Sequence, residues 1–346
     1  MNLKIFLKKV VRAVLPYGLL VLYRHIKNQR NAQIDRLPTT VRLEASTLCQ
    51  LKCAVCPMPK NKFLGKGYLK FEDFKKFIDD NKYIRKIELS NKGEIFLNPD
   101  LIHIIKYAHE NGIELTAANG VNFNSVSDEV LEGLVKYQFR FISISIDGAS
   151  QEIYSQYRIN GNFDTVIENV KKLNGYKEKY NSEFPVVNWQ LILMDHTEND
   201  IPKVKKMAKE LNMTSSFIFT WDWAMKYTPK NREMVARETG LISLNTTEHS
   251  QKNNNKHYYS PVCDQLFNSP QINWDGRLLG CCIPINKDFG VNVFDVGFIK
   301  AVNSKNYQYA KKMLKGKVVK PKETKNIPCA SCPVYKSMLE TGKFIP

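Results

Sequence analysis

The alternation of two periodicities between residues 38 and 240 constrains the fold of this chain most strongly. Short runs rich in β-branched and aromatic residues alternate with stretches whose apolar residues recur at helical spacing. We expect strands at residues 41–45, 86–90, 113–117, 141–146, 186–194 and 216–219. We expect helices between them at 71–78, 98–112, 130–135, 166–173 and 199–211. These alternations predict parallel strands with right-handed crossovers, hence an α/β barrel or a doubly wound sheet.

The 346 residues are enough for one large domain and an appendage. Residues 241–260 lose both periodicities and become polar, which predicts a linker. Residues 261–346 form a smaller, loop-rich region that contains cysteines. We therefore expect an N-terminal segment over 1–37, a core over 38–240, the linker and a small C-terminal domain.

Residues 1–37 mimic a signal peptide only superficially, because Pro16 and Gly18 interrupt the apolar run and no small-residue cleavage site follows it. The segment is basic and amphipathic. It lies either on an anionic membrane surface or against the outside of the core. No stretch approaches the roughly 18–20 apolar residues that span a bilayer. We expect a cytoplasmic protein, with peripheral membrane contact through this segment as an open alternative.

The formal net charge is +17, from 51 Lys and Arg against 34 Asp and Glu. A basic surface can attract nucleic acid, anionic lipid or a phosphorylated substrate. The lysines are scattered and are not interleaved with aromatic residues on one face. We therefore ascribe the charge to a Lys- and Asn-rich composition and expect no nucleic-acid partner.

The eight cysteines favour metal over disulfides, because the chain has no convincing export signal. Cys49, Cys53 and Cys56 form a C-x3-C-x2-C pattern in a loop directly after the first expected strand. Three thiolates this close suit a [4Fe–4S] cluster with one iron open to a further ligand. A disulfide pair, or a zinc site completed by a distant His, is the alternative.

A second group of cysteines lies near the C-terminus. Cys263 and Cys281 frame a C-x12-G-x4-C pattern, and Cys329 and Cys332 form C-x2-C. Four thiolates complete the ligand set of a cluster without an open iron, and structural zinc is the alternative. Cys282 is left over; it could donate a hydrogen atom or replace a ligand, but we expect a bystander.

Further polar motifs follow the expected strands, at the end where α/β folds bind ligands. They are Asn91-Lys-Gly-Glu94, Asn119-Gly120, Ser145-Ile-Asp147-Gly148 and Tyr157-Arg158. Each alone is a common turn sequence. Their order behind C-x3-C-x2-C is what makes a chance arrangement improbable.

With these motifs, residues 38–340 resemble the radical S-adenosylmethionine superfamily with a C-terminal extension of the SPASM or twitch type. The resemblance implies a partial (β/α)6 barrel followed by a small cysteine-rich domain. It also implies that S-adenosylmethionine chelates the open iron and is cleaved reductively to a 5′-deoxyadenosyl radical, which abstracts hydrogen from a C–H bond.

The resemblance implies roles for three residues of these motifs. Glu94, in the position of the family's Gly-Gly-Glu motif, would accept hydrogen bonds from the methionine amino group. Gly93 would allow close backbone approach. Arg158 would pair with the methionine carboxylate.

Other positions match the family less completely. Asn119 lies where the family often has Thr-Asn-Gly, and Ser145 and Asp147 lie in the segment that contacts the ribose and methionine ends. Two residues depart from the pattern: Val55 replaces an aromatic residue before the third cysteine, and Lys92 replaces the first glycine of Gly-Gly-Glu. We therefore expect the adenine packing and the backbone at Lys92 to differ from those of the family.

The C-terminal cysteines resemble the twitch form, which carries one auxiliary [4Fe–4S] cluster, better than the seven-cysteine SPASM form. Such a cluster is suited to accept an electron. We therefore predict oxidation of a small polar molecule, similar to a sugar or cyclitol, by an oxidoreductase that receives electrons from flavodoxin or ferredoxin. Modification of a ribosomal peptide or protein is the alternative, although only about 38 residues precede the barrel, fewer than the roughly 80 of a leader-binding module.

Two further readings remain. A redox-neutral epimerase would use the same first cluster, and a non-catalytic cluster scaffold would have no use for the S-adenosylmethionine motifs. Asp222 or His196 could take the proton that leaves an oxidised alcohol. Packing beside a strand end, or a turn cap in the case of His196, is the favoured explanation, so no catalytic base is assigned.

Overall fold

The computed structural model describes residues 37–58, 63–220, 227–252, 262–282, 286–317 and 327–345. The predicted amphipathic segment lies outside these residues except for its last position. Residues 253–260 of the predicted linker and Asp222 lie outside them as well.

One sheet with eight strands in the order β6-β5-β4-β3-β2-β1-β7-β8 organises the described chain. Neighbouring strands are parallel except β7 and β8, which are antiparallel. The strands are β1 (Thr40–Leu43), β2 (Lys86–Glu88), β3 (Glu114–Val121), β4 (Phe141–Ser145), β5 (Val186–Leu193), β6 (Thr214–Phe219), β7 (Gln271–Ile272) and β8 (Leu278–Gly280). The six predicted strands are confirmed as β1–β6, and the predicted α/β fold with a mostly parallel sheet is confirmed.

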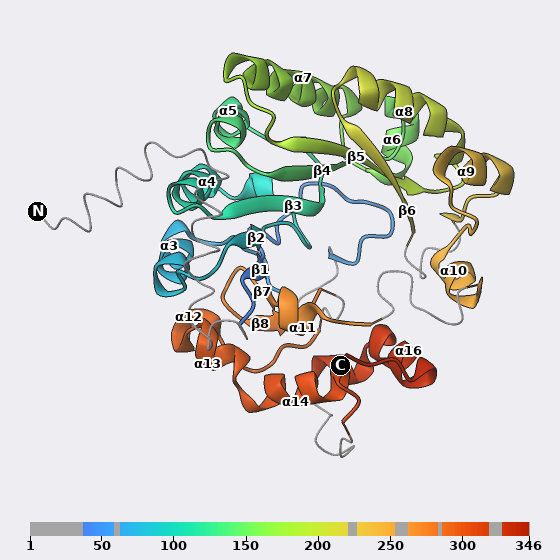
Figure 1. Ribbon diagram of the computed structural model, residues 1–346. Coiled ribbons are helices and arrows are strands. Elements are labelled where there is room, and N and C mark those ends of the chain that lie inside the picture. Colours follow the sequence, from blue (N-terminus) through green and yellow to red (C-terminus); the bar gives the residue numbers. More distant parts are fainter. Residues whose placement is uncertain are drawn as a thin grey trace, which may run out of the picture.

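Helices cover the outer face of the curved sheet, with α3, α4, α5, α7 and α8 following its arc (Figure 1). The helices of the core are α3 (Phe71–Asp80), α4 (Leu101–Glu110), α5 (Asp128–Lys136), α6 (Gln151–Tyr157), α7 (Phe163–Lys179), α8 (Ile201–Glu210) and α9 (Arg232–Thr239). Those after it are α10 (Thr246–Lys252), α11 (Gln265–Asn268), α12 (Val293–Val296), α13 (Phe298–Val302), α14 (Lys305–Leu314) and α16 (Pro333–Thr341). Short 3-10 helices are η3 (Ile95–Leu97), η4 (Glu198–Asp200) and η6 (Pro328–Ser331).

The strands have an apolar face and a polar face. Alternate side chains pack in the main core beneath the helices, among them Val41, Leu43, Ile87, Leu115, Ile142, Val187 and Trp189. The intervening positions are polar and hydrogen-bond across neighbouring strands. Asn188 Nδ2 donates to Ser143 Oγ at 3.1 Å and to Ser216 Oγ at 2.8 Å. The concave side of the sheet is therefore polar.

Side-chain caps set several helix starts. Ser127, Ser150, Asn162 and Asn231 each accept a hydrogen bond from a backbone N–H in the first turn of the following helix. Gly240 ends α9 in the left-handed region, at φ 75°. These caps let short helices connect successive parallel strands.

The C-terminal region does not form a separate body beside the barrel sheet. Strand β7 pairs with β1 in parallel, with Arg42 opposite Gln271, so the hairpin of β7 and β8 extends the same sheet. The hairpin could not be expected from periodicity because its strands are only two and three residues long.

The segment predicted as a linker contains a helix, α10. Reciprocal hydrogen bonds hold its first turn: Glu248 N donates to Asn245 Oδ1 at 2.8 Å, and Leu244 N donates to Glu248 Oε2 at 2.8 Å. Apolar periodicity missed this helix because capping, and not an apolar face, stabilises it.

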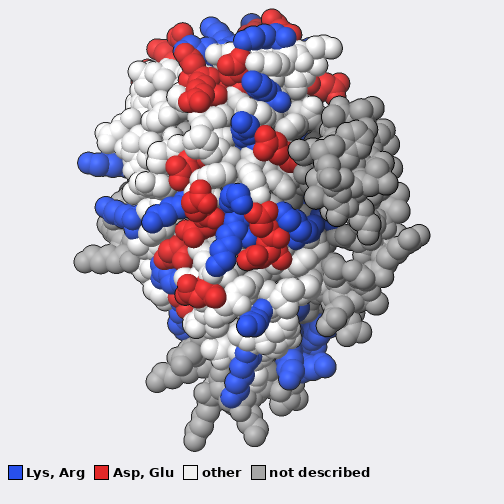
Figure 2. Space-filling model, turned by 90° about the vertical axis from the view of Figure 1, so that its left-hand side faces the viewer, with Lys and Arg blue, Asp and Glu red and all other residues white. Residues whose placement is uncertain are grey.

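The face formed by α3, α4 and α5 carries interspersed cations and anions (Figure 2). On α3, Asp79 pairs with Lys75 at 2.8 Å and with Lys82 at 2.5 Å. This face presents no field of a single sign. Among the described helices, none has the length and apolar character needed to cross a membrane.

Candidate active site

The three cysteines of the first group lie in the loop that follows β1. Burial, together with the charges of Glu94, Cys53 and Cys56, raises the pKa of Cys49 to about 11. Burial and the charge of Cys53 also raise the pKa of Cys56. The three thiols and Glu94 therefore lie within electrostatic reach of one another.

Two side chains donate hydrogen bonds to these sulfurs. Asn122 Nδ2 donates to Cys49 Sγ at 3.7 Å, and Arg158 Nη1 donates to Cys53 Sγ at 3.5 Å. Three thiols with polar donors suit a thiolate-ligated cluster, whose potential depends on such hydrogen bonds. In the described part of the chain, no three His, Cys, Asp or Glu side chains are grouped as a single metal ion would require.

Glu94 lies at the base of this loop and is buried. Its backbone N donates to Leu48 O at 2.7 Å, and its carboxylate accepts from Phe96 N at 3.3 Å and from Asn122 N at 2.5 Å. Burial raises its pKa to about 7. A Cβ on Gly93 would lie 2.2 Å from Ser46 O, so only glycine fits before Glu94.

Glu44, which the sequence did not single out, holds the same motif. Its Oε1 accepts from Lys92 N at 3.0 Å and from Gly93 N at 3.3 Å. Its Oε2 makes no hydrogen bond within the described residues, and burial raises its pKa to about 7. A carboxylate immediately after an apolar strand was the signal that could have identified it. Glu44 supplies the anchor for the backbone at Lys92, where the family has glycine.

Arg158 and Asp147 meet beside the cysteine loop. Arg158 Nε donates to Asp147 Oδ2 at 2.5 Å, and Ile192 N donates to Asp147 Oδ1 at 2.7 Å. The positive charge of Arg158 also acts to lower the pKa of Glu94 and Cys56. The structure thus brings Arg158, Asp147, Glu94 and the three cysteines together.

Asn119 and Ser145 lie on the neighbouring strands β3 and β4, where Asn119 is exposed and Ser145 is buried. Asn119 Nδ2 donates to Ser90 O at 2.6 Å, and Asn119 Oδ1 accepts from Arg42 Nη1 at 3.2 Å. Gly120 lies against Ser145, whose Oγ would be 2.4 Å from a Cβ at position 120. These contacts join Asn119 and Ser145 to neighbouring strands of the sheet and not to the cysteine loop.

The second group of cysteines surrounds Tyr307. Burial raises the pKa of this tyrosine, and the charges of Cys329, Cys281 and Cys263 act in the same direction. Burial raises the pKa of Cys263 to about 11, with the charge of Cys332 adding to it. The predicted thiols are thus close together, although they come from positions up to 69 residues apart in the chain, from Cys263 to Cys332.

Cys282, which we expected to be a bystander, lies within electrostatic reach of this group. Its charge contributes to the raised pKa of both Cys263 and Cys332. Its Sγ lies 3.6 Å from Gln265 Oε1. Two roles fit this position: a ligand of the cluster, or a thiol that lies beside the ligands.

Of the two candidate bases, only His196 lies within the described residues. His196 Nδ1 lies 3.2 Å from Asp195 Oδ1, and Nε2 has no hydrogen bond there. The ring also packs edge-on against Tyr227, with centroids 6.1 Å apart. These contacts fit packing as well as proton transfer.

Residues 43–208 match the sequence model of the Radical SAM superfamily. This stretch is therefore similar to a radical SAM domain. Proteins that share this domain and the named relatives below are enzymes, and this protein is an enzyme as well.

Two curated relatives share parts of the chain. An AdoMet-dependent heme synthase of Methanosarcina barkeri is 26% identical over 184 residues, which cover 53% of this chain and 50% of the relative. The mycofactocin maturase MftC of Mycobacterium tuberculosis is 27% identical over 139 residues, which cover 39% of this chain and 34% of the relative. The chain thus matches half or less of the length of these relatives.

A solved structure shows the same fold over most of the chain. Streptococcus suis SuiB, bound to its precursor peptide SuiA, superposes with a TM-score of 0.62 and 16% identity, over 91% of this chain and 75% of SuiB. The likeness extends well beyond residue 208, so the arrangement of the radical SAM domain with the C-terminal region is shared.

Proposed function

We propose that this enzyme cleaves S-adenosylmethionine at a [4Fe–4S] cluster held by Cys49, Cys53 and Cys56, and that it oxidises a small polar molecule. When bound, S-adenosylmethionine and its cluster supply hydrogen-atom abstraction from a C–H bond, and an auxiliary cluster supplies an acceptor for one electron. Loss of a hydrogen atom, a proton and an electron converts a secondary alcohol into a ketone, which balances the reaction.

The chain's own residues would bind and orient the cofactor. Glu94 presents two carboxylate oxygens that accept only backbone N–H groups so far, which leaves lone pairs for an ammonium group. Arg158 retains guanidinium N–H groups beyond those on Asp147 and Cys53, so it can also reach a carboxylate. Asp147, held by Ile192 N, keeps Arg158 in place.

The polar concave face of the sheet is the observation that carries the choice of substrate. A closed barrel is filled by branched aliphatic side chains. Here Glu88 accepts from Thr116 Oγ1 at 2.6 Å, Gln190 Nε2 lies 3.5 Å from Ser145 Oγ, and Arg42 is half-buried. Hydrogen-bonding side chains line this face, among them the carboxylate of Glu88 and the guanidinium of Arg42, which favours a hydroxylated molecule.

The auxiliary cluster would be held by Cys263, Cys281, Cys329 and Cys332. Support comes from their grouping around Tyr307 and from the burial of Cys281, Cys329 and Cys332. Their twitch-like arrangement remains part of this proposal. Flavodoxin or ferredoxin would supply the electron for the first cluster, and the N-terminal segment would provide any contact with a membrane surface.

Modification of a peptide is the second candidate, because MftC is a maturase and SuiB was solved with a precursor peptide. The discriminating measurement is deuterium transfer. Anaerobically reconstituted enzyme would be incubated with uniformly deuterated polyols and amino sugars, or with deuterated peptides, and 5′-deoxyadenosine analysed by mass spectrometry. Deuterium from a polyol supports the first candidate, and deuterium from peptides alone replaces it with the second.

The same enzyme with Cys53→Ala is the matched control. It should form no 5′-deoxyadenosine with any substrate, because the cluster loses a ligand. Formation of 5′-deoxyadenosine by the variant at the wild-type rate would refute the proposed role of this loop.

A further inference from the structure

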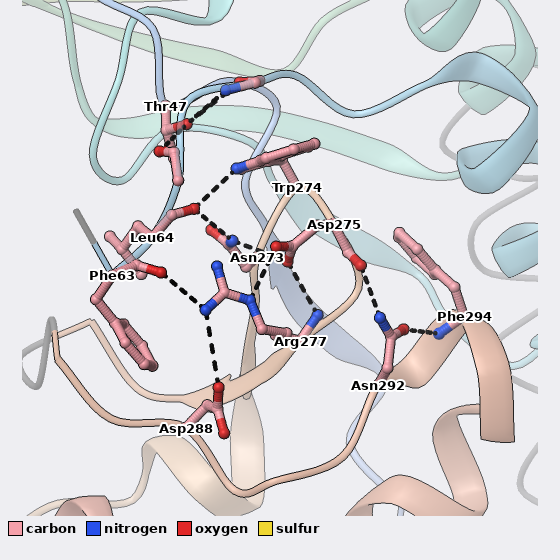
Figure 3. A network of polar contacts seen from close by, with 12 residues as sticks. Thr47, Phe63, Leu64, Asn273, Trp274, Asp275, Arg277, Asp288, Asn292 and Phe294 are labelled. Atoms are coloured by element: carbon pink, nitrogen blue, oxygen red, sulfur yellow. Dashed lines mark hydrogen bonds and ion pairs between the residues drawn. The ribbon is translucent and has the colours of Figure 1, made fainter.

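The turn between β7 and β8 packs against the segment from Phe63 to Gly67, which follows Cys56 in the sequence (Figure 3). Trp274 Nε1 and Asn273 Nδ2 both donate to the carbonyl oxygen of Leu64, each at 3.0 Å. Arg277 Nη1 donates to Phe63 O at 2.8 Å, and its guanidinium lies 4.9 Å from the centroid of the Phe63 ring. The turn thus holds two successive carbonyl groups of this segment.

The Trp274 indole occupies the space that a side chain at position 67 would need and lies within contact distance of position 65. A Cβ on Gly67 would lie 2.5 Å from Trp274 Cη2, and a Cβ on Gly65 would lie 3.4 Å from Trp274 Cζ2. Gly65 also has a positive φ of 70°. The positive φ explains the glycine at position 65, and a ring that lies 207 positions away in the chain explains the glycine at position 67.

Thr47 connects this contact to both ends of the cysteine loop. Thr47 N donates to Gly67 O at 2.9 Å, Gly67 N donates to Thr47 Oγ1 at 3.1 Å, and Thr47 Oγ1 donates to Gly65 O at 3.0 Å. Thr47 precedes Cys49 by two residues. A Cβ on Gly93 would lie 2.7 Å from Thr47 Cα, so the same threonine backs the motif that contains Glu94.

The turn is itself held rigidly. Asp275 accepts from Asn273 Nδ2 and from Arg277 Nε, each at 2.8 Å, and its carbonyl oxygen accepts from Asn292 Nδ2 at 2.8 Å. Gly276 has φ 86°, and a Cβ there would lie 2.2 Å from Asn292 Oδ1. These contacts within the turn hold Arg277 and the neighbouring Trp274 in the orientation in which they contact the segment from Phe63 to Gly67.

We infer that Trp274 and Arg277 are positioning residues for the cluster that binds S-adenosylmethionine. They hold the base of the loop of Cys49, Cys53 and Cys56 against the backbone at Gly93, so the C-terminal region fixes the geometry of the first site. A site of this kind binds well only when its supporting shell is locked. The inference rests on the proposed function in that it takes the three cysteines as cluster ligands.

The test compares reconstituted wild-type enzyme with Trp274→Ala, Trp274→Phe and Gly67→Ala. Gly67→Ala displaces the indole from the other side of the contact and leaves the sequence of the C-terminal region unchanged, which guards against a variant that merely fails to fold. Gly175→Ala is the matched control, because nothing lies within 4 Å of a Cβ at that helical position. Iron content, the EPR spectrum of the reduced cluster with and without S-adenosylmethionine, and uncoupled formation of 5′-deoxyadenosine are measured on each.

We expect Trp274→Ala and Gly67→Ala to weaken the spectral change caused by S-adenosylmethionine and to raise its KM about tenfold, while Gly175→Ala matches the wild type. Trp274→Phe should fall between, since it keeps a ring but loses the bond to Leu64 O. The double variant Gly67→Ala/Trp274→Ala should have no higher KM than either single variant, because both substitutions remove the same contact.

Wild-type spectra and KM in both Trp274→Ala and Gly67→Ala would overturn the inference while the proposed function stands. A wild-type enzyme whose spectrum does not respond to S-adenosylmethionine would refute the proposed function itself, and the inference with it. The two failures are therefore distinguished by the wild-type protein alone.

Discussion

Arg158 and Asp147 form an ion pair that is almost completely enclosed. Arg158 Nε lies 2.5 Å from Asp147 Oδ2, and the side chains are 13% and 0% exposed, respectively. Because Arg158 Nη1 also donates to Cys53 Sγ, the pair joins the end of β4 to the cysteine loop. The first predicted ligand site therefore depends on a charge pair within the fold.

Breaking this pair should be costly for folding. Arg158→Ala leaves the Asp147 carboxylate buried without a counterion, and we expect a loss of about 3–5 kcal/mol in the free energy of unfolding. Asp147→Asn keeps an acceptor for Ile192 N, so its loss should be smaller. Urea unfolding followed by circular dichroism measures both. Equal stabilities of Arg158→Ala and the wild type would show that the carboxylate is not charged in the fold.

Glu44 predicts a pH dependence of stability. Burial raises its pKa from 4.5 to about 7, so the folded protein binds more protons than the unfolded chain between these values. Stability is then present in full below about pH 4.5 and falls as the pH rises to 7, by about 3 kcal/mol for this group. Glu94 has the same direction of shift and should add to the slope.

Glu44→Gln is the variant that isolates this contribution. The amide oxygen can still accept from Lys92 N and Gly93 N, but no charge is buried. Between pH 5 and 8 its free energy of unfolding should fall less steeply than that of the wild type, and Glu94 should account for the remaining slope. Parallel curves for the two proteins would exclude a buried, titrating Glu44.

Gly120 and Gly240 provide a matched pair for backbone strain. Both have positive φ, at 111° and 75°, but only a Cβ at position 120 meets an atom, Ser145 Oγ at 2.4 Å. Gly240→Ala should cost about 1–2 kcal/mol from the left-handed conformation alone. Gly120→Ala should cost roughly 3 kcal/mol, because a clash is added. Thermal unfolding of both variants tests this, and equal losses would contradict the close contact with Ser145.

Local signals in the sequence were enough for the barrel strands and the cysteine loop. Each of β1–β6 is a short β-branched run, and the helix after it has its own apolar period. The polar face was also readable, since Arg42, Glu44, Asn188 and Gln190 interrupt apolar strands at every second position. The strands were predicted from their apolar residues alone, so these polar positions were not used.

Contacts between distant segments could not be predicted in this way. Nothing near Gly67 in the sequence indicates that Trp274 will cover it, and nothing near Arg42 indicates that Gln271 will extend its sheet. Helix α10 was missed because hydrogen bonds of Asn245 and Glu248 start it. Tertiary pairing decided the first two features, which a single sequence does not record, whereas local capping decided α10.

The C-terminal cysteines allow the two-cluster proposal to be tested by counting iron. The reconstituted wild type should hold about eight irons per chain, and Cys49/Cys53/Cys56→Ala about four. Cys329→Ser should also leave about four, because it removes one of the four proposed ligands, a buried thiol within electrostatic reach of Cys263 and Cys332. Zinc in place of the second set of irons would remove the electron acceptor and favour a redox-neutral reaction such as epimerisation.

Cys282→Ser separates a ligand from a neighbour in the same assay. If Cys281 completes the ligand set, Cys282→Ser should keep about eight irons and Cys281→Ser should lose about four. The reverse pattern would assign the fourth thiolate to Cys282, which already lies within electrostatic reach of Cys263 and Cys332. Retention of iron in both single variants, with loss in the double variant, would mean that the two adjacent thiols substitute for each other.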